Sequence, residues 1–162
     1  MSLKNSNIEI HGTSNYLDTE EFCIYAAKNP FWADCKSNEL ICKVKDRNAI
    51  AVNIVDADDS KYFKVAMFNR LVRIIDEKVK NGGTVHIICN KGQSRSASIA
   101  LLYLSAKGII SKTSYEKARH DFEKLYPNYL PGIGISKFLD KTWGLFFRPV
   151  KRPPRENKIY SS

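Results

Sequence analysis

Residues 85–96 have the sequence VHIICNKGQSRS, in which an apolar run gives way to a short polar loop that contains Gly92. The run at 84–88 is apolar and rich in β-branched residues, which predicts a buried strand. Residues 97–106 are rich in alanine and leucine and are followed by Gly108, which predicts a helix. The polar loop is therefore expected to join the end of a buried strand to the start of a helix.

Such a connection favours an anion-binding site. The N-terminus of a helix presents unpaired backbone N–H groups, and Gly92 allows the backbone to curl closely around a tetrahedral oxyanion. Cys89 lies at the end of the strand, where these N–H groups and Arg95 favour the thiolate, the nucleophilic form of the side chain. The Arg95 guanidinium is suited to gripping two phosphate oxygens at once. Ser96 follows directly, and its hydroxyl is a candidate to stabilise the thiolate.

The rest of the chain alternates between strand and helix patterns. We expect strands at 22–26 and 49–55, and helices at 61–80, from Thr113 to about 125, and around 135–143. Thr113 and Glu116 have the spacing of a capping box, which marks the start of the helix after 113. Helices interleaved with strands predict an α/β fold, in which a central, mostly parallel sheet is flanked by helices on both faces.

Cys89 and Arg95 are separated by five residues, and with Gly92 and the triplet at 94–96 they resemble the signature of dual-specificity protein phosphatases, within the protein tyrosine phosphatase superfamily. The resemblance extends over about 49–143. It implies a protein tyrosine phosphatase-like fold and attack by Cys89 on phosphorus to give a cysteinyl-phosphate, without a metal or other cofactor. The expected phosphate-binding residues are Asn90, Lys91, Gly92, Gln93, Ser94 and Arg95.

The same family implies a general acid, because the leaving oxygen needs a proton. Its pattern has an aspartate just after a strand and about thirty residues before the cysteine, and Asp56 stands at that place. Asp58 and Asp59 are the alternatives, although carboxylates in a loop are more often solvated than catalytic. The chosen aspartate would then act as the base for the water that hydrolyses the intermediate.

One position departs from the family pattern. The residue before the nucleophile is normally histidine and is Ile88 here, which leaves the pKa of the cysteine open. His86 lies two residues earlier and on the same face of the strand, so it is a candidate for a partial substitute. The alternative is that His86 is a core or surface histidine without a catalytic role.

The expected substrates are phosphotyrosine, phosphoserine and phosphothreonine in proteins, because the chain has no room for the recognition loop that deepens the pocket of tyrosine-only enzymes. Relatives of this fold also remove phosphate from RNA 5′ ends or inositol lipids. The formal net charge of +9 favours anionic partners without choosing among them. A catalytically weak, phosphate-binding pseudophosphatase is a further alternative, which the isoleucine before the nucleophile supports.

Composition and length predict a single phosphatase domain at 1–147 and a flexible, basic, proline-containing tail at 148–162. We find no signal peptide and no apolar run of the roughly 20 residues that span a bilayer, so a soluble, cytoplasmic protein is expected. The four scattered cysteines predict free thiols in a reducing compartment. The sequence leaves the oligomeric state open.

Overall fold

A computed structural model describes residues 1–27, 35 and 39–147. Its five strands form one sheet in the order β1-β5-β2-β4-β3. The strands are β1 (Ile8–Gly12), β2 (Phe22–Tyr25), β3 (Ile41–Lys43), β4 (Ala49–Val52) and β5 (Val85–Cys89). Neighbouring strands run parallel except β3, which is antiparallel to β4. The strand that ends in Cys89 is thus an inner strand, held by a neighbour on each side.

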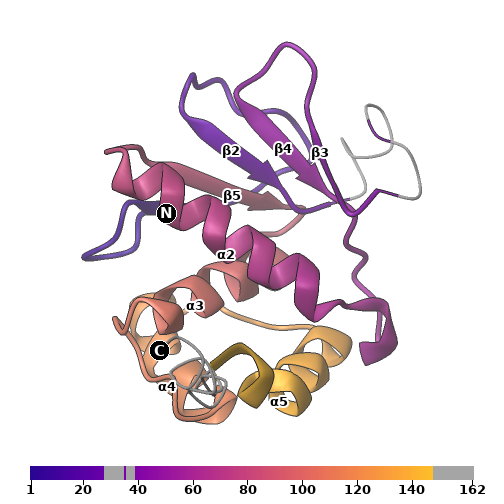
Figure 1. Cartoon of the computed structure of the whole chain (residues 1–162), viewed down its shortest axis with the longest axis vertical. Coiled ribbons are helices and arrows are strands. Elements are labelled where there is room, and N and C mark those ends of the chain that lie inside the picture. The colour runs from indigo at the N-terminus through magenta and orange to yellow at the C-terminus, as the bar shows by residue number, and fades with distance from the viewer. Residues whose placement is uncertain (28–34, 36–38, 148–162) are drawn as a thin grey trace, which may run out of the picture.

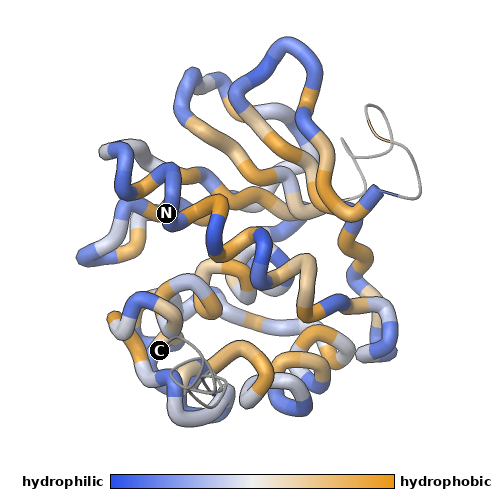
Figure 2. Tube along the Cα trace, viewed as in Figure 1, coloured by the Kyte–Doolittle hydropathy of each residue, from blue (hydrophilic) through white to orange (hydrophobic). Residues whose placement is uncertain are grey.

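The helical elements pack together below the sheet in the view of Figure 1. They are a 3-10 turn η1 (Ser60–Tyr62) and the helices α2 (Val65–Lys80), α3 (Arg95–Ala106), α4 (Tyr115–Leu125) and α5 (Ile133–Phe147). Figure 2 shows hydrophobic positions concentrated where the helices meet the sheet and hydrophilic positions at the loop tips. The predicted α/β fold with a mostly parallel sheet is confirmed.

The two faces of the sheet bury different clusters. Val85 and Ile87 of β5 join the large core that the helices build, whereas Ile88 packs with Tyr25 and Ala51 in a smaller cluster on the other face. No residue of a described helix belongs to that smaller cluster. The helices that the structure describes therefore pack against the face that carries Val85 and Ile87.

The element boundaries differ from the predictions in places. The helix expected at 61–80 begins at Val65, because the Asp59 carboxylate accepts a hydrogen bond from the Lys61 N–H at 2.9 Å and caps the separate turn η1. Buried Phe63 follows this turn in extended backbone and still reaches the core. The capping box at Thr113 was also wrong, since Ser114 is the N-cap of α4. Strands β1 and β3 were not predicted.

The cysteines correct another prediction. Cys35 and Cys42 are joined in a disulfide, with their Cα atoms 5.9 Å apart, whereas both were expected as free thiols. The two cysteines are seven positions apart in the sequence, and Cys42 lies in β3. Cys23 and Cys89 are free and buried, as predicted.

Two further predictions concern the C-terminal tail and membrane-spanning segments. The predicted tail at 148–162 lies outside the described residues. Within the described part, no helix is both long and apolar enough to traverse a lipid bilayer.

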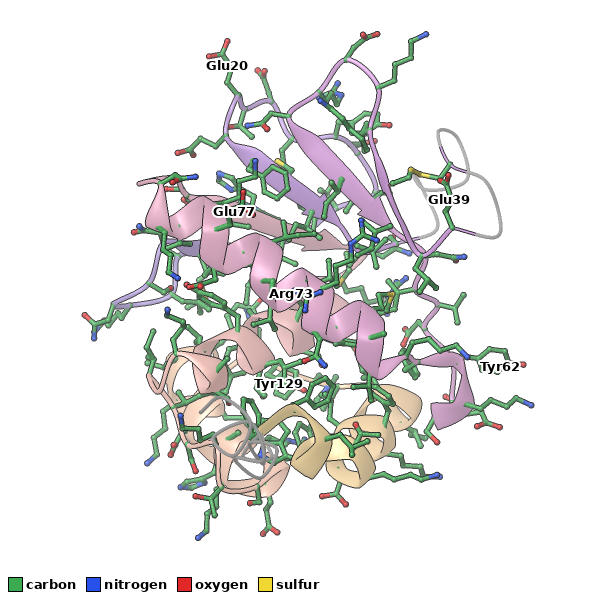
Figure 3. The ribbon with its side chains drawn as sticks, viewed as in Figure 1. Glu20, Glu39, Tyr62, Arg73, Glu77 and Tyr129 are labelled. Atoms are coloured by element: carbon green, nitrogen blue, oxygen red, sulfur yellow. A yellow bond between two sulfur atoms is a disulfide. The ribbon has the colours of Figure 1, made fainter. Side chains whose placement is uncertain are left out.

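A buried group of hydroxyls joins three parts of the helical layer. The Tyr129 hydroxyl lies 2.9 Å from Ser98 Oγ on α3 and 2.9 Å from the Tyr115 hydroxyl on α4. Burial raises the pKa of Tyr129 well above its ordinary value, so the phenol stays neutral. Figure 3 shows Tyr129 within the helical layer and Tyr62 at its outer edge. The segment before α5 is thereby tied to both preceding helices.

We predict that Tyr129→Phe lowers the free energy of unfolding by about 1–2 kcal/mol, because two buried hydroxyls lose their shared partner. Tyr62→Phe is the matched control, since Tyr62 is 54% exposed, and it should change stability by less than about 0.5 kcal/mol. Urea denaturation of both variants measures the difference. Equal stability of the two would show that the hydroxyl group contributes nothing.

Candidate active site

The predicted loop forms the floor of a cavity at the carboxyl end of β5. The cavity has a volume of about 200 Å³. Of the predicted catalytic and phosphate-binding residues, all but Gly92 and Ser96 line it, and Leu130 and Gly132 are added from the segment before α5. The cavity therefore lies at the loop that connects the end of β5 to the start of α3.

Cys89 is 2% exposed, and its Sγ atom lies 3.0 Å from Ser96 Oγ. Burial acts to raise the pKa of the thiol. Hydrogen bonds from the hydroxyl and the backbone of Ser96, the charge of Arg95 and a backbone hydrogen bond from Gly92 act in the opposite direction and together outweigh burial. The pKa of Cys89 is consequently below its ordinary value, so this buried sulfur ionises more readily than a free cysteine.

Arg95 is the first residue of α3 and is 6% exposed. Its Nη1 donates to the Ile54 carbonyl at 3.4 Å, whereas its Nε is buried without a hydrogen-bond partner in the described part of the protein. A buried donor that finds no acceptor costs about 1–3 kcal/mol. An oxyanion in the adjoining cavity would supply that acceptor.

The first half of the loop is pressed against the end of β1. Gly12 pairs with Cys89 in the sheet, and the Thr13 N–H donates to the Cys89 carbonyl at 3.0 Å. A Cβ atom at Gly12 would overlap the Lys91 carbonyl group. Gly92 has φ of +68°, a left-handed conformation that favours glycine. Two glycines thus permit the close approach of strand and loop.

The second half of the loop is tied by the residues before α5. The Tyr126 hydroxyl donates to the Gly92 carbonyl at 2.6 Å, and the Leu130 N–H donates to the Gln93 carbonyl at 2.9 Å. The Gly132 N–H donates to Ser94 Oγ at 2.8 Å. These three bonds occupy oxygen atoms of the loop and leave its backbone N–H groups able to bind an anion.

Four residues that shape the site were not predicted from the sequence: Gly12, Tyr126, Leu130 and Gly132. No local pattern marks them, because each acts through a contact with a segment far along the chain. The stretches around Tyr126 and at 130–134 were noted only as part of the resemblance to the phosphatase family.

Asp56 faces the cavity from the loop after β4 and is exposed. A Cβ atom at Gly132 would come within 2.9 Å of Asp56 Oδ1, so the absence of a side chain there leaves room for the carboxylate. Gly134 packs so closely on Ala57 that a Cβ atom would overlap its carbonyl oxygen. Asp58 and Asp59 do not line this cavity, and Asp59 is the cap of η1.

The side chain before Cys89 makes no polar contact with the loop. Ile88 is buried in the smaller cluster on the face of the sheet away from the helices. His86 has its ring nitrogens 2.9 Å from His11 Nε2 and 2.8 Å from Glu21 Oε1. These partners occupy both nitrogens of His86, so the His86 ring does not support the Cys89 thiol.

Comparison with known proteins places this geometry among phosphatases. The family model described as dual specificity phosphatase, catalytic domain, matches residues 22–130. No curated protein sequence matches the chain. Among solved structures, human DUSP28 aligns with a TM-score of 0.62 at 16% identity, over 86% of this chain and 92% of its own. This likeness shows a shared fold.

Two other solved structures illustrate the range of proteins with this fold. The human tyrosine phosphatase-like serine/threonine/tyrosine-interacting protein aligns with a TM-score of 0.59 at 18% identity, over 78% of both chains. PTPMT1, solved in complex with PI(5)P, aligns with a TM-score of 0.58 at 15% identity, also over 78% of both chains. Since identity is so low, neither similarity carries a substrate over to this chain.

We predict that Ser96→Ala moves the pH profile of Cys89 alkylation by iodoacetamide to higher pH. The Ser96 hydroxyl favours the thiolate, so its loss raises the pKa of Cys89, and less thiolate is present at any pH below that pKa. Ser105→Ala is the matched control, because Ser105 is also buried on α3 but its hydroxyl has no described partner. Its profile should not move, and an unmoved profile for Ser96→Ala would remove the hydroxyl from the explanation.

Proposed function

Because this chain belongs to the family of dual specificity phosphatase catalytic domains, we propose that it is an active phosphatase that hydrolyses phosphotyrosine, phosphoserine and phosphothreonine in proteins. The observation that carries the proposal is the meeting, at one cavity, of a thiol with a lowered pKa and a buried guanidinium with an unpartnered N–H. A phosphate dianion matches both, as an electrophile for the sulfur and an acceptor for the guanidinium.

In the first step the Cys89 thiolate attacks phosphorus as the bond to the leaving oxygen breaks. The guanidinium of Arg95 and the loop N–H groups hold the non-bridging oxygens through the transition state. Asp56, in its protonated form, gives its proton to the leaving oxygen, which departs as a neutral alcohol or phenol. The product on the enzyme is a cysteinyl-phosphate.

In the second step water attacks the phosphorus of the cysteinyl-phosphate. Asp56, now a carboxylate, takes a proton from the water, and the sulfur–phosphorus bond breaks to release inorganic phosphate. The Ser96 hydroxyl, 3.0 Å from the sulfur, stabilises the thiolate as it leaves. This restores the enzyme without a metal or redox cofactor in either step.

The proposed breadth of substrate follows from the size of the cavity. Its volume of about 200 Å³ is below the roughly 300–1,000 Å³ of typical ligand pockets. It accommodates a phosphate group, and the alcohol part is left to contact the rim, where Leu130 is 64% exposed. Such a site makes few contacts that separate a phenolic ester from an alkyl ester.

The main alternative within the family is a pseudophosphatase that binds phosphate without turning it over. Its support is Ile88 at the place of the usual histidine. Against it stand the lowered pKa of Cys89 and a carboxylate at Asp56 facing the same cavity, neither of which a binding module requires. Turnover measurements separate the two.

We predict that Cys89→Ser abolishes phosphate release from an aryl phosphate while inorganic phosphate still raises the thermal unfolding midpoint. The serine hydroxyl is a far weaker nucleophile, but the loop and Arg95 remain to bind the anion. Cys23→Ser, at the other free buried cysteine, is the control and should keep its turnover. If the native protein releases no phosphate although it binds the anion, the chain is a pseudophosphatase.

We predict that Asp56→Asn slows turnover by about 10²–10⁴-fold for alkyl phosphates, the size expected for loss of a general acid. The loss should be smaller for aryl phosphates with good leaving groups, because these need less protonation. Asp59→Asn is the matched control, since Asp59 caps η1 away from the cavity. A larger loss from Asp59→Asn than from Asp56→Asn would reassign the acid.

The substrate class is tested with a panel at one salt concentration: phosphotyrosine, phosphoserine and phosphothreonine peptides, a 5′-triphosphate RNA and a phosphoinositide. Comparable kcat/KM for the three peptides, above the other two substrates, is the expected result. Preference for the RNA or the lipid would replace the protein substrate while leaving the chemistry at Cys89 intact.

A further inference from the structure

A polar cluster lies on the face of the sheet that the described helices leave uncovered. It comprises Glu9 and His11 of β1 and His86 of β5, with Glu21 just before β2. Glu9 and His86 are direct partners in the parallel register of β1 and β5. Two of the three histidines in the chain therefore meet at one point, although they are 75 positions apart.

Three ligand atoms converge in this cluster. His11 Nε2 lies 2.9 Å from His86 Nδ1 and 3.8 Å from Glu9 Oε1, and His86 Nδ1 lies 4.0 Å from Glu9 Oε1. Ligands that bind a tetrahedral zinc ion at 2.0–2.1 Å are about 3.3–3.4 Å apart. The observed separations bracket that value, so the three atoms already lie about as far apart as ligands of one ion.

A fourth residue already stands where a metal-bound histidine needs support. His86 Nε2 is 2.8 Å from Glu21 Oε1, and a carboxylate accepts, so His86 carries its proton on Nε2. Its Nδ1 lone pair consequently faces His11 and Glu9. A carboxylate behind the far nitrogen is the arrangement that orients histidine ligands in metal proteins.

Without an ion, a proton joins the two histidines. Since His86 Nδ1 accepts, His11 Nε2 donates, and the ring centroids lie 5.1 Å apart with the nitrogens between them. A metal ion would take the place of this shared proton, with His11 changing to its other neutral tautomer and the rings turning so that both lone pairs meet at the ion.

We propose that Glu9, His11 and His86 form a binding site for a divalent transition-metal ion of the zinc type, with Glu21 as the residue that orients His86. Two imidazoles and one carboxylate suit zinc better than calcium or magnesium, which prefer oxygen ligands alone. The site has three protein ligands and leaves a position for water.

The proposed ion would act on the architecture of the active site rather than on its chemistry. It would join edge strand β1 to β5, and the residue after His11 is Gly12, which packs against the phosphate-binding loop. A bound ion therefore stabilises the strand pair that carries Cys89 at its end. The inference does not depend on turnover, and it stands whether the cavity is an enzyme site or a binding site.

The test measures Zn²⁺ binding by isothermal titration calorimetry, with no reductant, in the Cys89→Ser background. That background removes the reactive thiolate, and the disulfide of Cys35 and Cys42 prevents those sulfurs from binding the ion. We expect one Zn²⁺ per chain and a rise of the thermal unfolding midpoint. Co²⁺ should give the visible absorption of a tetrahedral site with nitrogen and oxygen ligands, without the charge-transfer band of a thiolate.

The variants are His11→Gln, His86→Gln and Glu21→Gln, and His120→Gln is the matched control because it changes the remaining, exposed histidine on α4. The first two should abolish binding, Glu21→Gln should weaken it by about 10–100-fold, and His120→Gln should leave it unchanged. Circular dichroism checks that each variant is folded. If His11→Gln or His86→Gln is unfolded, the Zn²⁺ affinity of Glu21→Gln decides the test. Absence of Zn²⁺ binding, or binding that survives both His11→Gln and Glu21→Gln, overturns the proposal.

Discussion

The balance between burial and hydrogen bonding at the Cys89 sulfur is the interaction on which the rest of the site depends. Burial of Cys89 disfavours its charged form and acts to raise its pKa. Hydrogen bonds from Ser96 and Gly92 and the charge of Arg95 favour the thiolate and together lower the pKa below its ordinary value. These donors come from one turn of chain, because strand β5 ends at the cysteine and helix α3 begins at the arginine. The strand has to be an inner one for this to work, since neighbours on both sides fix where its last residue lies.

For the proposed binding of phosphate, the carbonyl groups of the loop must also have partners other than the anion. Each residue that offers an N–H inward brings a carbonyl that needs another partner. The Tyr126 hydroxyl and the Leu130 N–H bind two of these carbonyls, and the end of β1 receives the Cys89 carbonyl through Thr13. The loop is thus held by two segments far apart in the sequence, the end of β1 and the residues before α5.

The sequence predicted what is local and missed what depends on distant contacts. The spacing of Cys89, Gly92 and Arg95 and the strand and helix around them could be found because one short stretch carries the motif. The placement of Asp56 at the cavity followed from the family pattern. Gly12 and Tyr126 could not be found, since neither belongs to a local pattern and each matters only once the loop is folded against it. Strand β1 was missed because its alternation is short and two of its outward positions are Glu9 and His11, which resemble a solvated loop.

The alternation of side chains along β5 explains why the two faces of the sheet have different surroundings. Its odd-numbered side chains face the helices, where the core is apolar, and its even-numbered ones face the other side. On that second side Ile88 continues an apolar cluster toward the centre of the sheet, whereas His86 meets polar groups from the edge strand. The histidine at position 86 therefore does not replace a histidine at position 88, because the two positions have different surroundings. At position 88 the loop keeps only its backbone partners, and at position 86 a polar group links β1 to the strand that ends in Cys89.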